Sequence, residues 1–240
     1  MTPDYSIIIP AYNEAHWLPQ TIASMHKAMT AVTQVGEVIV VDNNSSDNTA
    51  EIARRYKAKV VYEPINQISR ARNTGARNAQ GKYLIFVDAD TVISPALLKN
   101  ALERLVSGES SGGGAVVEFD APLNPLTKLA LRCWTLISVY FGLAAGCFIY
   151  CVKQDFTAVG GFSEAVYASE EVWFSLALKR IAKKQGKSFY IIQDYSAISS
   201  ARKLRWYNIG EQFLLLLMGV LFPFFVRFKG LCRFWYRRPS

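Results

Sequence analysis

The chain has 240 residues, of which 51% are hydrophobic and 19% are charged, a balance that excludes a disordered protein and provides for a large buried core. Its net charge is +8, and the basic excess lies late in the chain, where Lys and Arg alternate with Trp and Phe. This pattern favours an anionic membrane surface or a nucleic acid as a partner, and a solvated basic face fits it equally well.

The cysteines and the N-terminus indicate a reducing compartment. The four cysteines are Cys133, Cys147, Cys151 and Cys232. They lie in apolar surroundings without a CxxC pair, and the chain has only two histidines. We therefore expect buried thiols rather than a zinc site. Residues 1–5 are polar and lead directly into a strand, which is not the pattern of a signal peptide, so we expect an intracellular main body.

Strands and helices alternate along the first half of the chain. Uninterrupted apolar runs predict buried strands at 6–9, 38–41, 59–62, 83–87 and 115–119. Helical spacing and capping residues predict helices at 18–29, around 52–56, at 69–79 and at 95–106, the last with Ser94 as its cap. The glycine-rich stretch 108–114 is expected to be a flexible loop. The alternation predicts an α/β fold with a mostly parallel central sheet flanked by helices.

Polar side chains follow each of the first four predicted strands. They are Asn13 and Glu14, then Asp42, Asn43 and Asn44, then Glu63, and finally Asp88 and Asp90. Some of these polar clusters are explained by helix capping, and we favour that role for Asp47 or Asn48. Capping does not explain Asp88 and Asp90, because Ser94 caps the helix that follows them. Ligands of parallel sheets bind beyond the carboxyl ends of the strands, and paired carboxylates there can hold a hard divalent cation.

The form of the ligand follows from what the sequence lacks. It contains neither a Walker-type phosphate loop nor a GxGxxG pattern. A nucleotide would therefore not be held at a glycine-rich helix N-terminus. Its diphosphate would need a metal and basic side chains, which the two aspartates together with Arg70 and Arg72 can supply.

With these residues assembled, the chain resembles glycosyltransferase family 2, of the GT-A fold. The matching stretches in the first half are 8–14 (IIPAYNE), 40–49 (VVDNNSSDNT), 71–75 (ARNTG) and 86–90 (FVDAD). Those in the second half are 159–164 (VGGFSE) and 170–178 (EEVWFSLAL). Each stretch alone is weak, but their order and intervals are specific. The resemblance covers about residues 5–200.

The resemblance implies an inverting transfer from a UDP- or GDP-sugar donor. The implied donor-binding residues are Pro10, Ala11, Tyr12, Glu14, Asp42, Asn44, Arg70, Arg72 and Asp88. Asp90, with Asp88 beside it, would hold Mn²⁺ or Mg²⁺ against the diphosphate, where the cation neutralises charge on the leaving group.

The family also implies a carboxylate general base at the start of a helix. The usual Glu-Asp pair is replaced here by Glu170 and Glu171, and we expect Glu171 to be the base, with Glu170 as the alternative. The other interpretation is that both acids only stabilise a helix N-terminus. Trp173 and Ala177 stand where the family often has an acid and an arginine. We expect the acceptor to contact Gly160, Gly161, Phe162 and Trp173.

Two apolar segments bear on membrane association. Residues 133–152 carry no charge and are long enough to span a bilayer. A span there would separate Asp90 from Glu171, so we expect a helix at 125–141 and a buried strand at 146–152 instead. Residues 213–226 form a shorter uncharged run between basic residues and Trp, which indicates an interfacial anchor. The alternative is a helix packed on the catalytic domain.

These observations predict a catalytic domain at 1–200, with a nucleotide-sugar half at 1–107 and an acceptor half at 108–200, followed by a membrane-associating segment at 201–240. We expect a cytoplasmic hexosyltransferase attached peripherally to the inner membrane face, with a lipid-linked or membrane-proximal glycan as acceptor and no nucleic acid partner. The alternatives are a nucleotidyltransferase and a non-enzymatic basic protein that binds membranes or nucleic acid.

Overall fold

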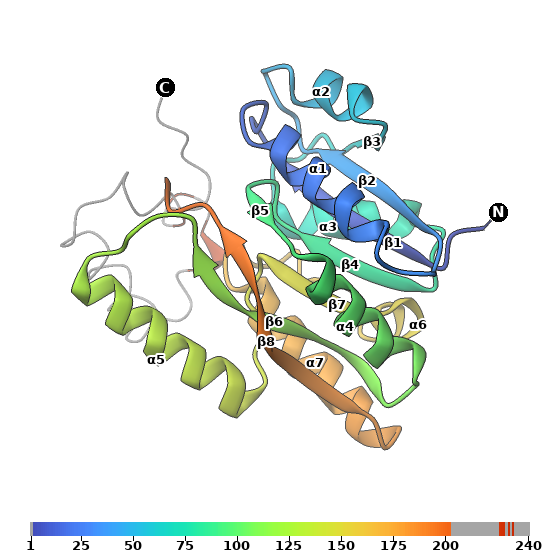
Figure 1. The fold of residues 1–240 in the computed structure, drawn as a ribbon, viewed down its shortest axis with the longest axis vertical. Helices are drawn as coiled ribbons and strands as arrows, with labels where there is room; N and C mark the ends of the chain where they lie inside the picture. Colours follow the sequence, from blue (N-terminus) through green and yellow to red (C-terminus); the bar gives the residue numbers. More distant parts are fainter. Residues whose placement is uncertain (1, 203–225, 229, 231, 233–240) are drawn as a thin grey trace.

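One mixed sheet with helices on both faces forms the part of the chain that the computed structural model describes, residues 2–202, 226–228, 230 and 232. Its strands are β1 (Tyr5–Ala11), β2 (Gly36–Asp42), β3 (Lys59–Tyr62), β4 (Tyr83–Val87), β5 (Thr91–Val92), β6 (Ser110–Phe119), β7 (Phe148–Val152) and β8 (Ser188–Ser199). Its helices are α1 (Leu18–Met29), α2 (Thr49–Arg55), α3 (Ile68–Asn78), α4 (Pro95–Val106), α5 (Pro125–Phe141), α6 (Lys153–Ala158) and α7 (Glu170–Lys184). Figure 1 shows their arrangement.

The sheet changes direction in its middle. The strand order is β3-β2-β1-β4-β7-β6-β8-β5, and β3, β2, β1 and β4 run parallel, as predicted. β7 is antiparallel to both β4 and β6, β6 and β8 are parallel, and the short β5 is antiparallel to β8. The carboxyl ends of β1, β2 and β4 therefore lie at one edge, where β7 begins beside the end of β4.

Strand side chains alternate between two cores, which is why the strands are apolar throughout. In β1, Ile7 and Ile9 pack with residues of α1 and α4 on one face, while Ile8 packs with residues of α3 and α7 on the other. The same alternation holds in β4, where Ile85 faces the first core and Phe86 the second. β1, β2 and β4 are thus covered on both sides.

The prediction of a flexible loop at 108–114 is wrong for most of that stretch. β6 begins at Ser110 and carries Gly112, Gly113 and Gly114 as paired strand residues. A side chain at Gly113 would place its Cβ 1.8 Å from the carbonyl oxygen of Tyr190 on the neighbouring strand. These glycines therefore permit a close approach of backbones within the sheet rather than flexibility.

The uncharged run 133–152 divides as predicted. α5 ends at Phe141, Gly142 follows in the left-handed conformation (φ 58°), and the chain enters β7 at Phe148. In the described part of the chain, no helix is both long enough and apolar enough to cross a membrane. The expectation that all four cysteines are buried is wrong at Cys133, which lies exposed on α5.

Only a few residues of the predicted membrane-associating segment, 201–240, fall within the described ranges. Val226 and Cys232 are buried against Val166 and Ala168, and the backbone amide of Tyr167 donates to the carbonyl of Val226 at 2.6 Å. This contact lies in the loop that leads into α7. The predicted anchor at 213–226 otherwise lies outside the described residues.

Candidate active site

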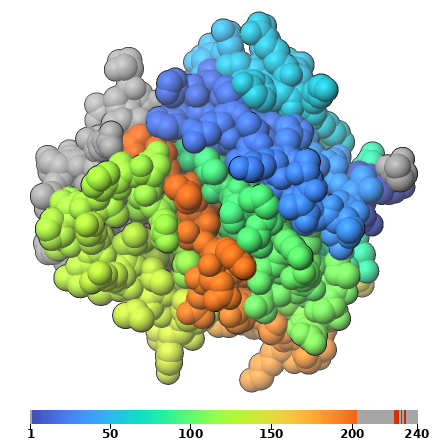
Figure 2. Space-filling model, in the orientation of Figure 1, coloured from blue at the N-terminus to red at the C-terminus, as the bar shows by residue number. Residues whose placement is uncertain are grey.

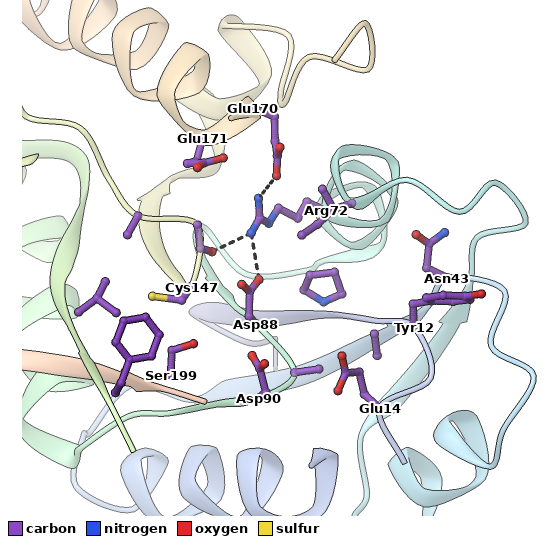
Figure 3. A pocket seen from close by; sticks show the side chains of 18 of the residues that line it. Tyr12, Glu14, Asn43, Arg72, Asp88, Asp90, Cys147, Glu170, Glu171 and Ser199 are labelled. Atoms are coloured by element: carbon purple, nitrogen blue, oxygen red, sulfur yellow. Dashed lines mark hydrogen bonds and ion pairs between the residues drawn. The ribbon is translucent and has the colours of Figure 1, made fainter. Parts of the chain in front are cut away.

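A cavity of about 320 Å³ opens at the carboxyl edge of the parallel strands. Its wall is built from the ends of β1 and β4, from α3, from the loop before β7, and from the start of α7 (Figure 3). The predicted site residues that line it are Pro10, Ala11, Tyr12, Glu14, Arg72, Asp88, Asp90, Glu170 and Glu171. The topology thus brings together acids from β4 and from α7, which are about 80 positions apart in the sequence.

Arg72 connects these two groups of acids. Its side chain is 1% exposed, and it contacts Glu170 (Nη1–Oε1, 2.5 Å) and Asp88 (Nη2–Oδ1, 3.0 Å). Nη2 also donates to the carbonyl of Gly146 at 2.7 Å, and Figure 3 shows all three contacts. Burial alone lowers the pKa of Arg72, but the charges of Asp88 and Glu170 raise it above its ordinary value. Arg72 therefore remains a buried cation that fixes both acids.

Glu171 differs from Glu170 in its surroundings. It is half-buried and lines the cavity, and among the described residues no ion pair holds it, whereas Glu170 is 3% exposed and paired with Arg72. Burial, and next the neighbouring charge of Glu170, raise the pKa of Glu171 to about 8. In its ionised form, a carboxylate with that pKa takes up a proton more readily than an ordinary one, which suits a general base.

The start of α7 is fixed against the loop that precedes β7. The hydroxyl of Ser175 donates to the carbonyl of Glu171 at 2.7 Å and accepts from the amide of Ala144 at 3.0 Å. A Cβ at Gly146 would lie 3.0 Å from Nη2 of Arg72 and 3.7 Å from Cδ of Glu171. Gly146 therefore leaves the space that both side chains use.

On the cavity wall opposite Glu170 and Glu171 (Figure 3), Asp90 and Glu14 both contact the positively charged side chain of Arg202. The guanidinium of Arg202 contacts Oε1 of Glu14 at 2.5 Å and Oδ2 of Asp90 at 2.9 Å through Nη2, and Oδ2 again through Nε at 3.1 Å. All three side chains are at most 10% exposed. Arg202 belongs to the basic excess late in the sequence, and nothing in its sequence neighbourhood predicts this contact.

The loops after β1 and β2 support each other. The carboxamide oxygen of Asn13 accepts from the amide of Ser46 at 2.8 Å, and the amide of Glu14 donates to Oγ1 of Thr49 at 2.9 Å. Asn13 takes a left-handed conformation (φ 53°), which asparagine tolerates better than most residues. The paired loops hold Tyr12 at the cavity, where Asn43 joins it (Figure 3).

Three predicted donor-binding residues do not line the cavity. Asp42 accepts from the amide of Ser45 at 3.0 Å, and Asn44 accepts from the hydroxyl of Tyr62 at 2.8 Å. Arg70 pairs with Glu164 at 3.1 Å on the partly exposed side of α3. These contacts stabilise the loops and the helix beside the cavity.

None of the four predicted acceptor-binding residues lines the cavity either. Gly160 and Gly161 form a left-handed turn after α6, and Phe162 is buried beside Phe86 and Phe174. Trp173 is 54% exposed on α7. The cavity wall on that side instead includes Leu131 and Trp134 of α5, Val117 and Phe119 of β6, and Ser199 of β8. The apolar character of α5 was visible in the sequence, but its position beside the cavity was not.

The donor set at this edge suits a hard divalent cation. Asp88, Asp90 and Glu14 supply carboxylate oxygens, the ligands that Mg²⁺ and Mn²⁺ prefer in proteins. Within the described ranges, no cluster of three or more His, Cys, Asp or Glu side chains stands ready to hold a metal ion. Asp88 and Asp90 each contact an arginine instead. The oxygen ligands therefore suit a divalent cation, although Asp90 and Glu14 both contact the positively charged guanidinium of Arg202 in this structure.

Comparison with known proteins shows which sequences and structures the chain is similar to. The sequence model described as "Glycosyl transferase family 2" matches residues 6–137. Over 136 residues the chain is 39% identical to "Glycosyltransferase AglE" of Haloferax volcanii, a match that covers 50% of this chain and 41% of that protein. The matches to the first three curated relatives span 31%, 31% and 18% of their lengths.

Solved structures agree in fold. TarS of S. aureus in complex with UDP-GlcNAc has a TM-score of 0.63 at 20% identity, and the match covers 82% of this chain and 58% of that one. The mannosyltransferase PcManGT of Pyrobaculum calidifontis, in complex with GDP-Man and Mn²⁺, has a TM-score of 0.62 at 20% identity, covering 83% and 57%. The GT-A fold expected from the sequence is therefore confirmed.

Proposed function

Because this chain belongs to glycosyl transferase family 2, we propose that it transfers a sugar from a UDP- or GDP-sugar to a hydroxyl group, with inversion at the anomeric carbon. The observation that carries the proposal is the placement of Glu171 across one cavity from Asp88 and Asp90 (Figure 3). Glu171 can act as a base on one wall, and the carboxylates on the other wall can bind a cation. This arrangement suits a displacement in which the nucleophile and the leaving group lie on opposite sides of the sugar.

Each wall has its own task in this proposal. Tyr12, Pro10 and Ala11 contact the nucleoside, and Asp90, with Asp88 beside it, would hold a divalent cation. When bound, that cation would supply positive charge against the departing diphosphate. Glu171 takes the proton of the acceptor hydroxyl as its oxygen bonds to the anomeric carbon. Two related structures contain a nucleotide-sugar, one of them with Mn²⁺, which supports this assignment of donor and cation.

Glu170 is a positioning residue in this scheme. Its carboxylate is buried and already bound to Arg72, so it is poorly placed to take a proton from an acceptor. Through Arg72 it is linked to Asp88 on the far wall. Substituting Glu170 should therefore disturb both walls of the cavity, whereas substituting Glu171 should remove only the base.

A panel of UDP- and GDP-sugars tests the proposed activity. We expect the purified chain to bind one or more of them in the presence of Mn²⁺ and to release the nucleoside diphosphate slowly by hydrolysis. Glu103→Gln, on the exposed face of α4, is the control for Glu171→Gln, because it also replaces a glutamate by glutamine but lies away from the cavity. Metal-independent binding, or transfer of a nucleotidyl group in place of the sugar, would contradict the proposal.

We also propose a lipid-linked or membrane-proximal acceptor and attachment to the inner membrane face, on the basis of α5. Leu126, Leu129, Leu136 and Tyr140 lie on one face of this helix, at spacings of three, four or seven residues, and are 52%, 58%, 71% and 84% exposed. Figure 2 shows α5 at the surface of the molecule. Lys128 and Arg132 are exposed on the same helix, so its charge suits anionic lipid.

The same helix also reaches the cavity, through Leu131 and Trp134. An acceptor whose lipid lies along the exposed face of α5 could therefore place its head group beside Glu171. This continuity favours a lipid surface over a protein partner as the occupant of the exposed face.

Vesicle sedimentation tests the membrane proposal. Full burial of a leucine is worth about 1.5–3 kcal/mol, so Leu129→Glu with Leu136→Glu should reduce binding to vesicles containing anionic lipid by more than about tenfold. Val106→Glu, at an exposed apolar position on α4, is the matched control. Equal sedimentation of the double variant and the control would contradict the role of α5.

A further inference from the structure

Several contacts hold Arg202 beside Asp90 and Glu14, the two acids that line one wall of the cavity. It lies three residues beyond β8, whose end pairs with β5 directly after Asp90. The amide of Ser200 donates to the carbonyl of Asp90 at 3.2 Å, and the amide of Ala201 donates to Oδ1 of Asp120 at 2.8 Å. The guanidinium also lies 5.3 Å from the ring centroid of Trp17. Backbone and side-chain contacts thus place the Arg202 charge between Asp90 and Glu14.

This position conflicts with a divalent cation on Asp90. Nε of Arg202 donates to Oδ2 of Asp90, and Nη2 lies 2.9 Å from the same oxygen while also binding Glu14. An Mg²⁺ ion bound to that oxygen would approach to about 2.0–2.1 Å and would meet a positive charge already at hydrogen-bond distance. Like charges this close in a partly buried site repel each other strongly. The two cations therefore cannot share this oxygen.

We propose that Arg202 and the divalent cation compete for Asp90, so that Arg202 neutralises Asp90 and Glu14 until a cation displaces it. The inference rests on the proposed assignment of Asp90 to the cation. It adds that the metal site is closed by a side chain of the same chain, and that binding a metal moves Arg202. A displaced guanidinium at this edge is suited to bind the phosphate oxygens of the donor, because arginine binds phosphate in a bidentate manner.

The competition predicts a direct effect on metal affinity. Mn²⁺ alone is titrated into the full chain, and free Mn²⁺ is measured by electron paramagnetic resonance. Arg202→Gln should bind Mn²⁺ at least about tenfold more tightly than wild type, because it removes the competing charge. Arg55→Gln, from an exposed ion pair with Glu51, removes the same charge elsewhere and should leave the affinity unchanged. Arg202→Lys keeps a cation and should fall between the two.

Adding Asp90→Asn separates this inference from the proposed function. If Asp90→Asn abolishes Mn²⁺ binding while Arg202→Gln and Arg55→Gln bind alike, the cation site stands and the competition is wrong. If neither wild type nor Arg202→Gln binds Mn²⁺, the assignment of Asp90 is wrong and the inference falls with it. Tighter binding by Arg202→Gln that Asp90→Asn removes supports both.

Tryptophan emission gives a second readout that does not depend on an Arg202 variant folding. Displacement of Arg202 takes a cation away from the ring of Trp17, so Mg²⁺ should change the emission of wild type more than that of Trp17→Phe. An equal response of the two proteins to Mg²⁺ would overturn the displacement.

Discussion

Arg72 of α3 and Glu170 of α7 form a buried ion pair, with Nη1 and Oε1 2.5 Å apart, although 98 positions separate them in the chain. The pair joins the predicted nucleotide-sugar half, 1–107, to the predicted acceptor half, 108–200. Through its second nitrogen, Arg72 also contacts Asp88. One buried cation therefore determines how the end of β4 and the start of α7 face each other across the cavity.

Replacing Arg72 should destabilise the whole domain. Arg72→Met keeps an unbranched apolar stem but leaves Asp88 and Glu170 without their cation, and removing one partner of a buried pair costs about 3–5 kcal/mol. Denaturant unfolding measures the loss. Arg55→Met breaks an exposed pair and should cost less than about 1 kcal/mol. Similar unfolding midpoints for the two variants would show that the Arg72 pair does not hold the halves together.

Replacing Glu171 should affect turnover and spare donor binding. Glu171→Gln keeps the shape of the side chain but cannot accept the proton, so we expect kcat to fall about 10²- to 10⁴-fold. Calorimetric titration of the donor with Mn²⁺ should give an affinity close to that of wild type. Loss of donor binding in this variant would place Glu171 in the donor site and remove the argument for a base.

The parallel half of the fold could be predicted from sequence because β1, β2 and β4 are covered on both faces. Uninterrupted runs such as Ile7 to Ile9 carry that information locally, and the polar residues after them mark the strand ends. Asp88 and Asp90 were therefore identified as site candidates before their partners were visible. Ser94 was also identified correctly as a helix cap, and its hydroxyl accepts from the amide of Leu97 at 3.1 Å.

The partners of these acids could not be predicted, because they depend on distant pairing. Nothing local marks Glu170 as the partner of Arg72, and Arg202 reads as one member of a basic cluster with Lys203 and Arg205. The ion pairs of Arg202 arise because the end of β8 pairs with β5. β5 has only two residues and contains no apolar run from which it could be predicted. The cavity-lining residues of α5 could not be predicted for the same reason, since α5 reaches the cavity only through the tertiary fold.

The glycines of β6 provide a test of residues 110–114, the part of the strand that was predicted to be a loop. Gly113→Ala should destabilise the protein by about 3 kcal/mol or more, because the added Cβ meets the carbonyl of Tyr190 and the side chain of Tyr150. Gly108→Asn is the matched comparison, since Gly108 has a left-handed backbone (φ 78°) with open space around it. Thermal denaturation distinguishes them. A Gly113→Ala melting temperature equal to that of Gly108→Asn would fit a flexible loop and contradict the strand.

The raised pKa of Glu171 predicts how activity depends on pH. The base works only when ionised, and with a pKa of about 8 roughly a tenth of the molecules carry that charge at pH 7. We expect kcat/KM to rise nearly tenfold per pH unit below about pH 8 and to level off above it. A rate already constant from pH 6 upward would contradict Glu171 as the base.

The same pKa predicts an effect on stability with the opposite sign. Between about pH 4.5 and 8 the folded protein keeps a proton on Glu171 that the unfolded chain releases, so ionisation makes folding less favourable as the pH rises through this window. Glu171→Gln removes that cost. Its melting temperature should exceed that of wild type near pH 9 and approach it near pH 4.5, while Glu103→Gln, at an exposed site, should show no such pH-dependent difference. A Glu171→Gln melting temperature that differs from wild type equally at both pH values would mean that the carboxyl group titrates normally in the folded protein.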